Sequence, residues 1–484
     1  MPIASQNECR LPSANMVPRR TIYISLMLLV LLCYRGILDN WLFNDDFSWL
    51  KAARYDMTPG NLLTFQVVEF LRPLVNLSFW AMEKADPGNV PMLYAVNLIL
   101  HILCTFLVFR LALALFGNLW LAAMSGALFA VTSVHSAAVF WISARTTLLS
   151  TFFLLASIDV AISGRGAGAL RAVASVALYI LALASKEEAI AGLFLFALLF
   201  TLGRRKEGGG TAISSALLVS VTIVSVVYLL IRQSVIGGYV RENWGPGGHA
   251  FRNVAGGLLD QFYPWPFFSL FYRAGTFIPE PSGSVMPELI VLPVAGLLVL
   301  AAYVVRRPRE MAVAIGWAVL SLVPASFFKY RFFSTVSSSQ NRYYYLSSVG
   351  TVMIVALLLS LVWKERSRVR QWLMVALFVL ICAGYVVRDV LLERQWDDFT
   401  RMYRGVVTAI VKESSMFHGV TTLAVEGSDL AFPYLADAVA LERPLWKVLP
   451  VTGGKKAAER HAPCLYISFT GDRVRAMRVV EIEK

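Results

Sequence analysis

The chain has 484 residues, of which 57% are hydrophobic and only 15% are charged, and its mean hydropathy is +0.63. A composition this apolar excludes a soluble globular protein of this length and indicates a polytopic membrane protein. The formal net charge of +13 is therefore read as a topology signal and not as a sign of nucleic-acid binding, because Lys and Arg of membrane proteins gather in cytoplasmic loops.

Apolar runs that are long enough to cross a bilayer recur along the chain. A helix rises about 1.5 Å per residue, so a run of roughly 20 residues spans the hydrocarbon core, and we expect about 11 transmembrane helices in an all-α membrane domain. The expected spans fall near residues 22–38, 93–116, 119–139, 148–163, 172–184, 189–202, 212–231, 289–305, 311–327, 343–363 and 372–390.

Basic residues alternate from one connection to the next. They collect on every second connection, at Arg19 and Arg20, Arg165 and Arg171, Arg204 to Lys206, Arg306 to Arg309, and Lys364 to Arg370. The positive-inside rule makes these connections cytoplasmic, so the N-terminus is expected inside and the tail from Leu391 extracytoplasmic. The first span is followed by Asp-Asn-Trp and by no small-residue cleavage site, so we expect it to remain as an anchor.

The first outward segment, residues 39–92, opens with Asn44-Asp45-Asp46-Phe47. A carboxylate at a membrane surface is costly, and two adjacent ones raise the pKa of one of them toward that of a useful base. We therefore expect Asp45 and Asp46 to be catalytic, although Asp is also a common helix N-cap. Farther along, the near-helical alternation of residues 61–72 predicts a helix lying in the membrane interface, either roofing a cavity or serving as a plain surface helix.

Two later outward segments carry unusual residues. The segment 233–288 is rich in aromatic residues around Pro264-Trp265-Pro266, which is typical of a headgroup-level belt and alternatively of stacking on a sugar or lipid. The connection from Lys329 and Arg331 to Arg342 holds three basic residues and no acid. Such a pattern suits a phosphate held at the outer face, or else non-specific anchoring to anionic lipids.

The tail changes character after the last span. Residues 423–425 and 465–469 read as strands, 470–472 as a hairpin turn and 475–482 as a returning strand, which predicts a small α+β domain outside the membrane. We expect three parts: a cytoplasmic segment 1–20, a transmembrane domain 21–392 and an extracytoplasmic domain 393–484. Trp396-Asp397-Asp398-Phe399 is interpreted as an interfacial Trp with helix-starting acids, and not as a sequon-binding motif.

An ordered set of short motifs resembles a known family. The motifs are Asn44 to Phe47, Leu71-Arg72-Pro73-Leu74, Val134-His135 through Trp141 to Arg145, Ala184-Ser185-Lys186-Glu187-Glu188, and Asn341-Arg342 through Tyr345 to Gly350. In this order they resemble the membrane region of the TPR-containing O-mannosyltransferases, which belong to the GT-C glycosyltransferase superfamily. The resemblance covers roughly residues 39–403, but the chain lacks the TPR array and has a different tail.

The resemblance implies a GT-C-type enzyme that moves a sugar from a polyprenyl-phosphate carrier to an acceptor hydroxyl on a protein, glycan or lipid. It places Asp45 at the catalytic acidic position of the superfamily and Asp46 at the second acidic position. The basic residues Arg342, Lys329, Arg331 and Arg145 would stabilise the leaving phosphate, as oriented cations do for a developing anion. The remaining polar motif residues, expected to bind substrate, are Arg72, His135, Lys186, Glu187 and Tyr345.

No metal or other cofactor is expected, because the five cysteines show no CxxC spacing and no ligand cluster is visible. For His135 and for Lys186 with Glu187 or Glu188, a purely structural role in the bundle stays open. Three other functions also remain open: a transporter or flippase of a polyprenyl-linked sugar, a scaffold for the tail domain, and a transferase acting on lipid A or a polysaccharide. We expect a bacterial inner-membrane location.

Overall fold

The computed structural model describes residues 18–67, 70–163, 168–202, 213–236, 250, 253–254, 257–258, 261, 307–327, 342–363, 367–415, 422–426, 432–442, 447–450, 464–470 and 473–480. The chain divides into two compact units. The first unit comprises Met1–Arg35, Ala95–Phe140 and Ala144–Glu393, and the second comprises Gly36–Tyr94, Trp141–Ser143 and Arg394–Lys484.

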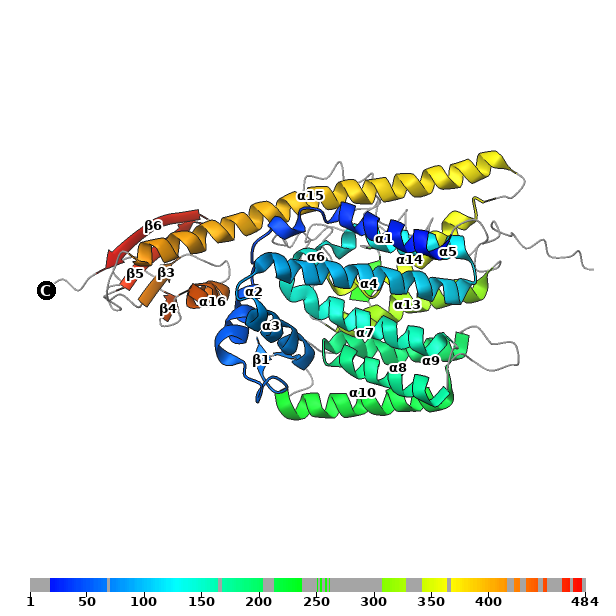
Figure 1. The fold of residues 1–484 in the computed structure, drawn as a ribbon, viewed down its shortest axis with the longest axis horizontal. Helices are drawn as coiled ribbons and strands as arrows, with labels where there is room; N and C mark the ends of the chain where they lie inside the picture. The colour runs from blue at the N-terminus through cyan, green and yellow to red at the C-terminus, as the bar shows by residue number, and fades with distance from the viewer. Residues whose placement is uncertain are drawn as a thin grey trace, which may run out of the picture. The chain divides into compact units, whose positions relative to one another are not determined.

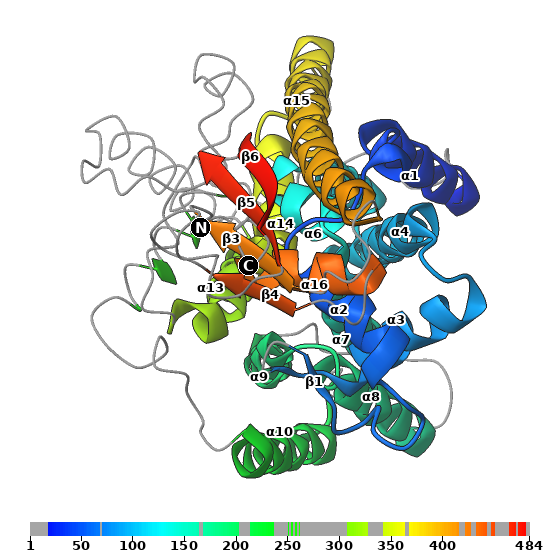
Figure 2. The same cartoon turned by 90° about the vertical axis from the view of Figure 1, so that its left-hand side faces the viewer.

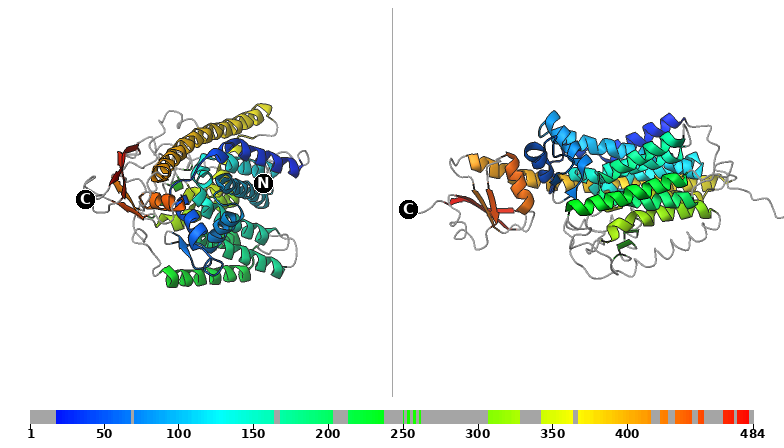
Figure 3. Two further views of the ribbon diagram at one scale, coloured as in Figure 1. Left: turned by 60° about the vertical axis from the view of Figure 1, so that its left-hand side comes forward. Right: turned by 90° about the horizontal axis from the view of Figure 1, so that it is seen from below.

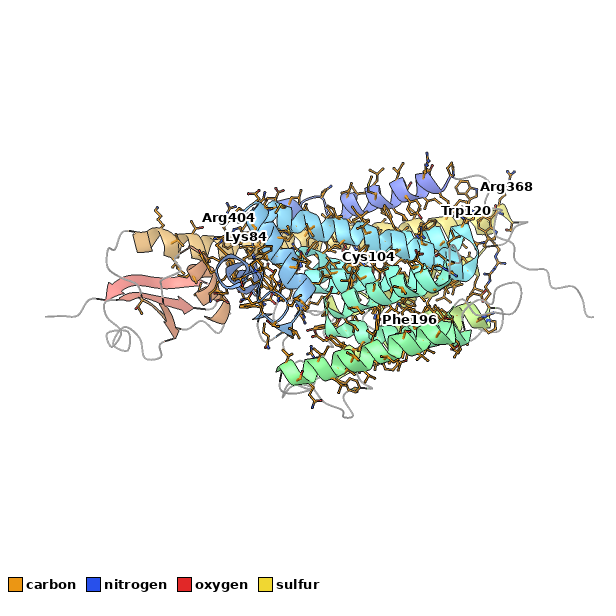
Figure 4. All side chains as sticks on the ribbon, turned by 60° about the horizontal axis from the view of Figure 1, so that its bottom comes forward. Lys84, Cys104, Trp120, Phe196, Arg368 and Arg404 are labelled. Atoms are coloured by element: carbon orange, nitrogen blue, oxygen red, sulfur yellow. The ribbon has the colours of Figure 1, made fainter. Side chains whose placement is uncertain are left out.

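The first unit is a bundle of apolar helices. It contains α1 (Arg19–Cys33), most of α4 (Val90–Phe116), α5 (Leu119–Val131), α6 (Ser136–Phe140), α7 (Arg145–Ile162), α8 (Gly168–Leu183), α9 (Ala191–Leu202), α10 (Ser215–Ile236), α13 (Pro308–Ser326), α14 (Ser348–Ser360) and the first part of α15 (Arg368–Ser415). Helices α7 to α10 lie side by side, and α13 packs between α9 and α14 (Figure 1). Cys104, at the middle of α4, lies inside this bundle (Figure 4).

Five described helices are long and apolar enough to cross a membrane. They are Val90–Phe116, Ile142–Ile162, Gly168–Ser185, Ser215–Val235 and Arg368–Lys412, and a sixth candidate is the pair Leu119–Val131 and Ser133–Phe140, bent by 49°. Each predicted span that falls in the described part of the chain overlaps a helix of the bundle, so an integral membrane protein is confirmed, but the count of 11 spans stays a prediction. The span expected at 289–305 lies outside the described residues.

Contacts between connections follow the predicted alternation. Arg309, in the first turn of α13, donates its Nε–H to the carbonyl of Leu202 at the end of α9, at 2.7 Å; both lie at connections predicted to be cytoplasmic. Trp120 and Arg368, which begin α5 and α15, also lie at one end of the bundle (Figure 4). The side of the membrane that this end faces stays a prediction.

The short turn between α4 and α5 shows how the sequence directs the bundle. Gly117 has a φ of 63°, a left-handed conformation that suits glycine and ends α4. Asn118 then caps α5, since its Oδ1 accepts from the amides of Trp120 and Leu121, each at 3.0 Å. Two residues are therefore enough to reverse the chain.

The second unit combines short helices with a small sheet. It contains α2 (Asp46–Lys51), a π turn (Ala52–Asp56), β1 (Gln66–Val67), β2 (Phe70–Leu71), α3 (Pro73–Ala85), the last part of α15, β3 (Thr422–Glu426), α16 (Phe432–Glu442), β4 (Lys447–Pro450), β5 (Cys464–Thr470) and β6 (Arg473–Val480). The sheet order is β4-β3-β5-β6, with β3 parallel to β4 and β5, and β6 antiparallel to β5. Helix α16 links β3 to β4 and lies beside this sheet, as two views agree (Figures 2 and 3).

The predicted strands of the tail match observed strands. Residues 423–425 and 465–469 lie within β3 and β5, and the returning strand is β6, beginning two residues before the predicted start. Strand β4 and helix α16 were not predicted. The unit also joins the tail to residues 36–94 and 141–143, and all of these segments are predicted to face outward.

The predicted interfacial helix at 61–72 is wrong. Residues 59–64 form turns, and Gln66–Val67 pairs with Phe70–Leu71 in a small antiparallel hairpin. The turns have local causes: the Asn61 side chain accepts from the amide of Thr58 at 2.7 Å, and the Asn76 amide donates to the carbonyls of Leu62 and Phe65. A proline at the first position of α3 also favours an extended Arg72.

Candidate active site

The two adjacent carboxylates lie on a tight turn that begins α2. The amide of Asp46 donates to the carbonyl of Phe43 at 3.1 Å, which closes a four-residue turn. Within it Asn44 has a φ of 54°, the one positive φ of a non-glycine residue among the described parts of the chain. Asn tolerates this conformation better than most residues, and backbone strain of this kind is concentrated at functional sites.

Asp46 is fully buried and holds this turn in place. Its Oδ2 accepts from the amide of Phe43 at 2.9 Å, and its Oδ1 accepts from the amide of Ser143 at 2.7 Å and from the Ser143 hydroxyl. Burial, and secondly the charge of Asp45, raise the pKa of Asp46 to about 8, while the hydrogen bonds from Ser143 and Phe43 oppose the rise. Asp46 is therefore a residue that organises the site, with its proton-binding tuned to near neutral pH.

Asp45 has a different environment. It occupies the N-cap position of α2 but makes no side-chain capping bond, and its backbone carbonyl accepts from the amide of Trp49 at 3.2 Å. It is only half-buried, in contrast to Asp46. The alternative interpretation, that one of these acids serves as a helix cap, is thus not supported, and Asp45 is the partly exposed carboxylate of the pair.

Aromatic side chains anchor the turn on both sides. The Phe43 ring meets Trp141, Trp396, Phe399 and Tyr403 in edge contacts with centroid distances of 4.9–5.6 Å. Phe47 stacks on Tyr403 at 6.2 Å. The Asn44-Asp45-Asp46 triplet therefore lies between two anchored rings.

This cluster corrects the interpretation of Trp396. The side chain of Trp396 is fully buried against Phe43, so it is not an interfacial anchor. Asp397 and Asp398 lie inside α15 and do not start a helix. Burial also argues against a Trp396 side chain displayed to a peptide.

The first unit holds two cations on one aromatic ring. The Nζ of Lys186 lies 4.7 Å from the ring centroid of Tyr343, and the guanidinium carbon of Arg342 lies 5.1 Å from it. Lys186 is buried and also contacts Thr147 Oγ1 and Glu188 Oε1, each at 2.8 Å. The start of α7 and the connections before α9 and α14, all predicted to face outward, therefore meet at Lys186, Tyr343 and Arg342, which we name the Tyr343 cation cluster.

Two more predicted residues lie in the same unit. Glu187, which follows Lys186 in the sequence, forms an ion pair with Arg232 near the end of α10, at 3.8 Å. A fourth connection that is predicted to face outward, the one after α10, therefore lies close to the Tyr343 cation cluster. Arg145 is fully buried at the start of α7, and its Nε–H donates to Asn97 Oδ1 at 3.1 Å.

His135 and Tyr345 come together, but in the packed interior. The His135 and Tyr345 rings lie 4.5 Å apart, and His101 Nδ1 and the Tyr345 hydroxyl share a hydrogen bond of 2.7 Å. His135 Nε2 bonds the Ser348 hydroxyl at 2.7 Å, and all of these side chains are buried. Their contacts favour a structural network over the predicted substrate-binding role.

The remaining predicted residues are separate. Arg72 belongs to the second unit, where its guanidinium carbon lies 3.9 Å from the Phe70 ring centroid. Lys329, Arg331 and most of the aromatic segment 233–288 lie outside the described residues. Over the part of the chain that the structure describes, no group of three or more His, Cys, Asp or Glu side chains is placed to hold a metal ion.

Several residues of these clusters were not predicted. Ser143 and Tyr343 stand inside the quoted motifs, so their positions were visible, but nothing in the sequence shows that Ser143 donates to Asp46. Thr147 and Phe43 carry no signal beyond their neighbours.

Comparison with known proteins gives the fold. Neither a protein-family profile nor a curated protein sequence matches the chain. The crystal structure of the Archaeoglobus fulgidus oligosaccharyltransferase tethered to an acceptor peptide containing the NVT sequon is similar, with 14% identity and a TM-score of 0.50 over 91% of this chain. The archaeal oligosaccharyltransferase AglB in complex with an inhibitory peptide and a dolichol-phosphate matches with 14% identity and a TM-score of 0.49 over 91% of this chain.

The chain spans 64% of the length of the first of these structures. That protein is an oligosaccharyltransferase, so the comparison does not support the predicted resemblance to the TPR-containing O-mannosyltransferases. The likeness shows that this chain shares the overall fold of that oligosaccharyltransferase.

Proposed function

We propose that the protein is a membrane glycosyltransferase that moves a sugar from a polyprenyl-phosphate carrier to an acceptor hydroxyl at the non-cytoplasmic face. The observation that carries the proposal is the strained Asn44 turn, which leaves Asp45 half-buried beside a fully buried and hydrogen-bonded Asp46. The fold shared with the archaeal oligosaccharyltransferase supports this proposal.

The chemistry follows from the environment of each carboxylate. Asp45 takes the proton of the acceptor hydroxyl, whose oxygen then bonds to the anomeric carbon. The bond between that carbon and the phosphate oxygen breaks with inversion, and polyprenyl phosphate leaves with the electron pair. Asp46 keeps the turn in place through its hydrogen bonds to Phe43 and Ser143, and burial raises its pKa to about 8, so the role of base is assigned to Asp45.

The leaving phosphate needs cations and no general acid. The sequence resemblance assigns this role to Arg342 and Arg145, and Lys186, which shares the Tyr343 ring with Arg342, is a further candidate. Fixed cations stabilise an anion most strongly where water is excluded. Lys329 and Arg331 precede Arg342 on the same connection and complete the set of basic residues assigned to the phosphate.

The acceptor and the sugar are finer proposals. The similar archaeal structure carries an acceptor peptide, so a protein acceptor is the first to test here, followed by glycan and lipid acceptors. The motifs shared with O-mannosyltransferases favour a hexose such as mannose.

The test is transfer of radiolabelled sugar from a panel of synthetic polyprenyl-phosphate sugars, with purified protein and native membrane extract as the acceptor. Asp45→Asn should lose transfer by at least about 100-fold, the scale of a positioned base, with the fold intact. The matched control is Asp56→Asn, which makes the same change at an exposed carboxylate of the same segment. Transfer that is indifferent to Asp45→Asn would refute the assigned base, and no transfer from any donor would favour a transporter or scaffold.

A further inference from the structure

Helix α16 of the tail packs along the segment that carries the two carboxylates. Asp437 of α16 accepts from the Ser48 hydroxyl at 2.5 Å and from Lys51 Nζ at 2.9 Å. One turn later, the carbonyl of Leu441 accepts from the Tyr55 hydroxyl at 2.8 Å and from the Arg54 guanidinium at 3.3 Å. We name this set of contacts the α2–α16 interface, and Figure 2 shows the two helices together.

The spacing of these residues makes the interface continuous. Ser48 and Lys51 are three residues apart on α2, and Asp437 and Leu441 are four apart on α16, so each pair lies on one face of its helix. The Leu441 carbonyl belongs to the last turn of α16, where carbonyls have no partner within the helix. The first outward segment therefore supplies partners that α16 itself cannot.

Helix α2 is also fixed from a second element. Trp49, between Ser48 and Lys51 in sequence, is buried and stacks on Phe79 of α3, with the ring centroids 5.3 Å apart and the rings tilted by 20°. Asp45 is the N-cap residue of α2, so its position follows that of the helix. Contacts from α3 and α16 thus limit how far the carboxylate can move.

We propose that α16 is a positioning element for Asp45 and that Asp437 is its positioning residue; the catalytic consequence rests on the proposed function. Loss of Asp437 frees one face of α2. A displacement of about 1 Å at a reacting group can lower a rate roughly 100-fold. The expected effect is a lower kcat with little change in the KM for the donor, because the cations assigned to the donor phosphate belong to the other unit.

The experiment measures hydrogen exchange and turnover on the full chain in detergent micelles. In Asp437→Ala, peptides covering residues 46–56 should exchange at least about ten times faster, while those of α3 stay as in the unaltered protein and report an intact fold. Asp437→Asn keeps an acceptor for Ser48 but loses the ion pair to Lys51, so residues 46–56 should exchange at a rate between those of Asp437→Ala and the unaltered protein. Asp56→Asn, on the same segment but exposed, should exchange as the unaltered protein does.

Turnover with the polyprenyl-phosphate sugar panel completes the test. The proposal is supported if kcat falls most in Asp437→Ala and less in Asp437→Asn, with the KM for the donor unchanged in both. Unchanged protection of residues 46–56 overturns it, and so does lost protection with unchanged kcat. If Asp45→Asn transfers sugar normally, the proposed function fails, while the exchange result still decides whether α16 holds α2.

Discussion

At the scale of single residues, the carboxylate pair consists of one buried residue that organises the turn, Asp46, and one partly exposed residue, Asp45. Two adjacent aspartates have the same chemistry, and only their surroundings make them different. Asp46 accepts three hydrogen bonds from two segments, whereas Asp45 stays half-buried at a helix start. This asymmetry is what acid and base assignments in other enzymes depend on.

The raised pKa of Asp46 predicts a pH-dependent stability. Its pKa rises from 3.8 to about 8 on folding, so the folded state binds the proton more tightly than the unfolded chain does. Its stabilising contribution is therefore complete below about pH 4 and is lost as the pH rises toward 8 and beyond. Thermal unfolding from pH 5 to 9 should show the unaltered protein losing stability relative to Asp46→Asn, and a constant difference between the two would contradict this.

Substitutions in the Lys186–Glu188 ion pair can distinguish a structural role of Lys186 from a role in binding the donor. Lys186→Met leaves the mostly buried Glu188 without this partner and should cost about 3 kcal/mol of unfolding free energy. Adding Glu188→Gln removes the second charge and should restore most of the stability, but the donor KM should stay at least about ten times higher, since one cation proposed to bind the donor phosphate is gone. The matched control is Arg110→Met with Asp159→Asn, an ion pair of the same bundle, which should leave the KM unchanged.

At the scale of helices, α13 and α14 approach too closely for any side chain at Gly350. A Cβ built there would lie 2.5 Å from both the carbonyl oxygen of Ala314 and the amide nitrogen of Ala318, and backbone atoms cannot move aside as a side chain does. Gly350→Ala should therefore cost about 3 kcal/mol. Gly405 of α15 has open space around its Cβ position, so Gly405→Ala should instead gain up to about 1 kcal/mol through helix propensity. Melting temperatures of the two variants test this pair of opposite signs.

The sequence predicts these elements wherever the physics is local or periodic. Long apolar runs place the bundle helices, and alternating strand residues followed by Thr470-Gly471-Asp472 place β5 and β6. The prediction of a helix at residues 61–72 is wrong because an apolar pattern alone does not reveal that Asn61 and Asn76 will hold the chain in turns. The contacts of Ser143 and Asp437 were not predicted for another reason. Their partners Asp46 and Ser48 lie 97 and 389 residues away in the sequence, and only the fold brings them together.

At the scale of the whole molecule, the division into units agrees with the charge pattern. Residues 36–94, 141–143 and the tail form one compact unit, and each of these segments is predicted to lie after an odd-numbered span. These segments consist mainly of residues outside the predicted spans, so their packing into one unit is consistent with a common side of the membrane. The alternation read from Lys and Arg is thereby supported, although the absolute side is not.

Two single-cysteine variants can test which side of the membrane each end of the bundle faces, in a background where Cys9 and Cys464 are replaced by serine. Lys84 and Arg368 are both exposed, and they lie in the first outward segment and at the cytoplasmic start of α15 by the predicted topology (Figure 4). Lys84→Cys should react with a membrane-impermeant maleimide in intact cells, and Arg368→Cys only after permeabilisation. The reverse pattern would place Asp45 on the cytoplasmic side, because Asp45 and Lys84 belong to the same compact unit. The proposed transfer at the non-cytoplasmic face therefore depends on this result as much as on the carboxylate itself.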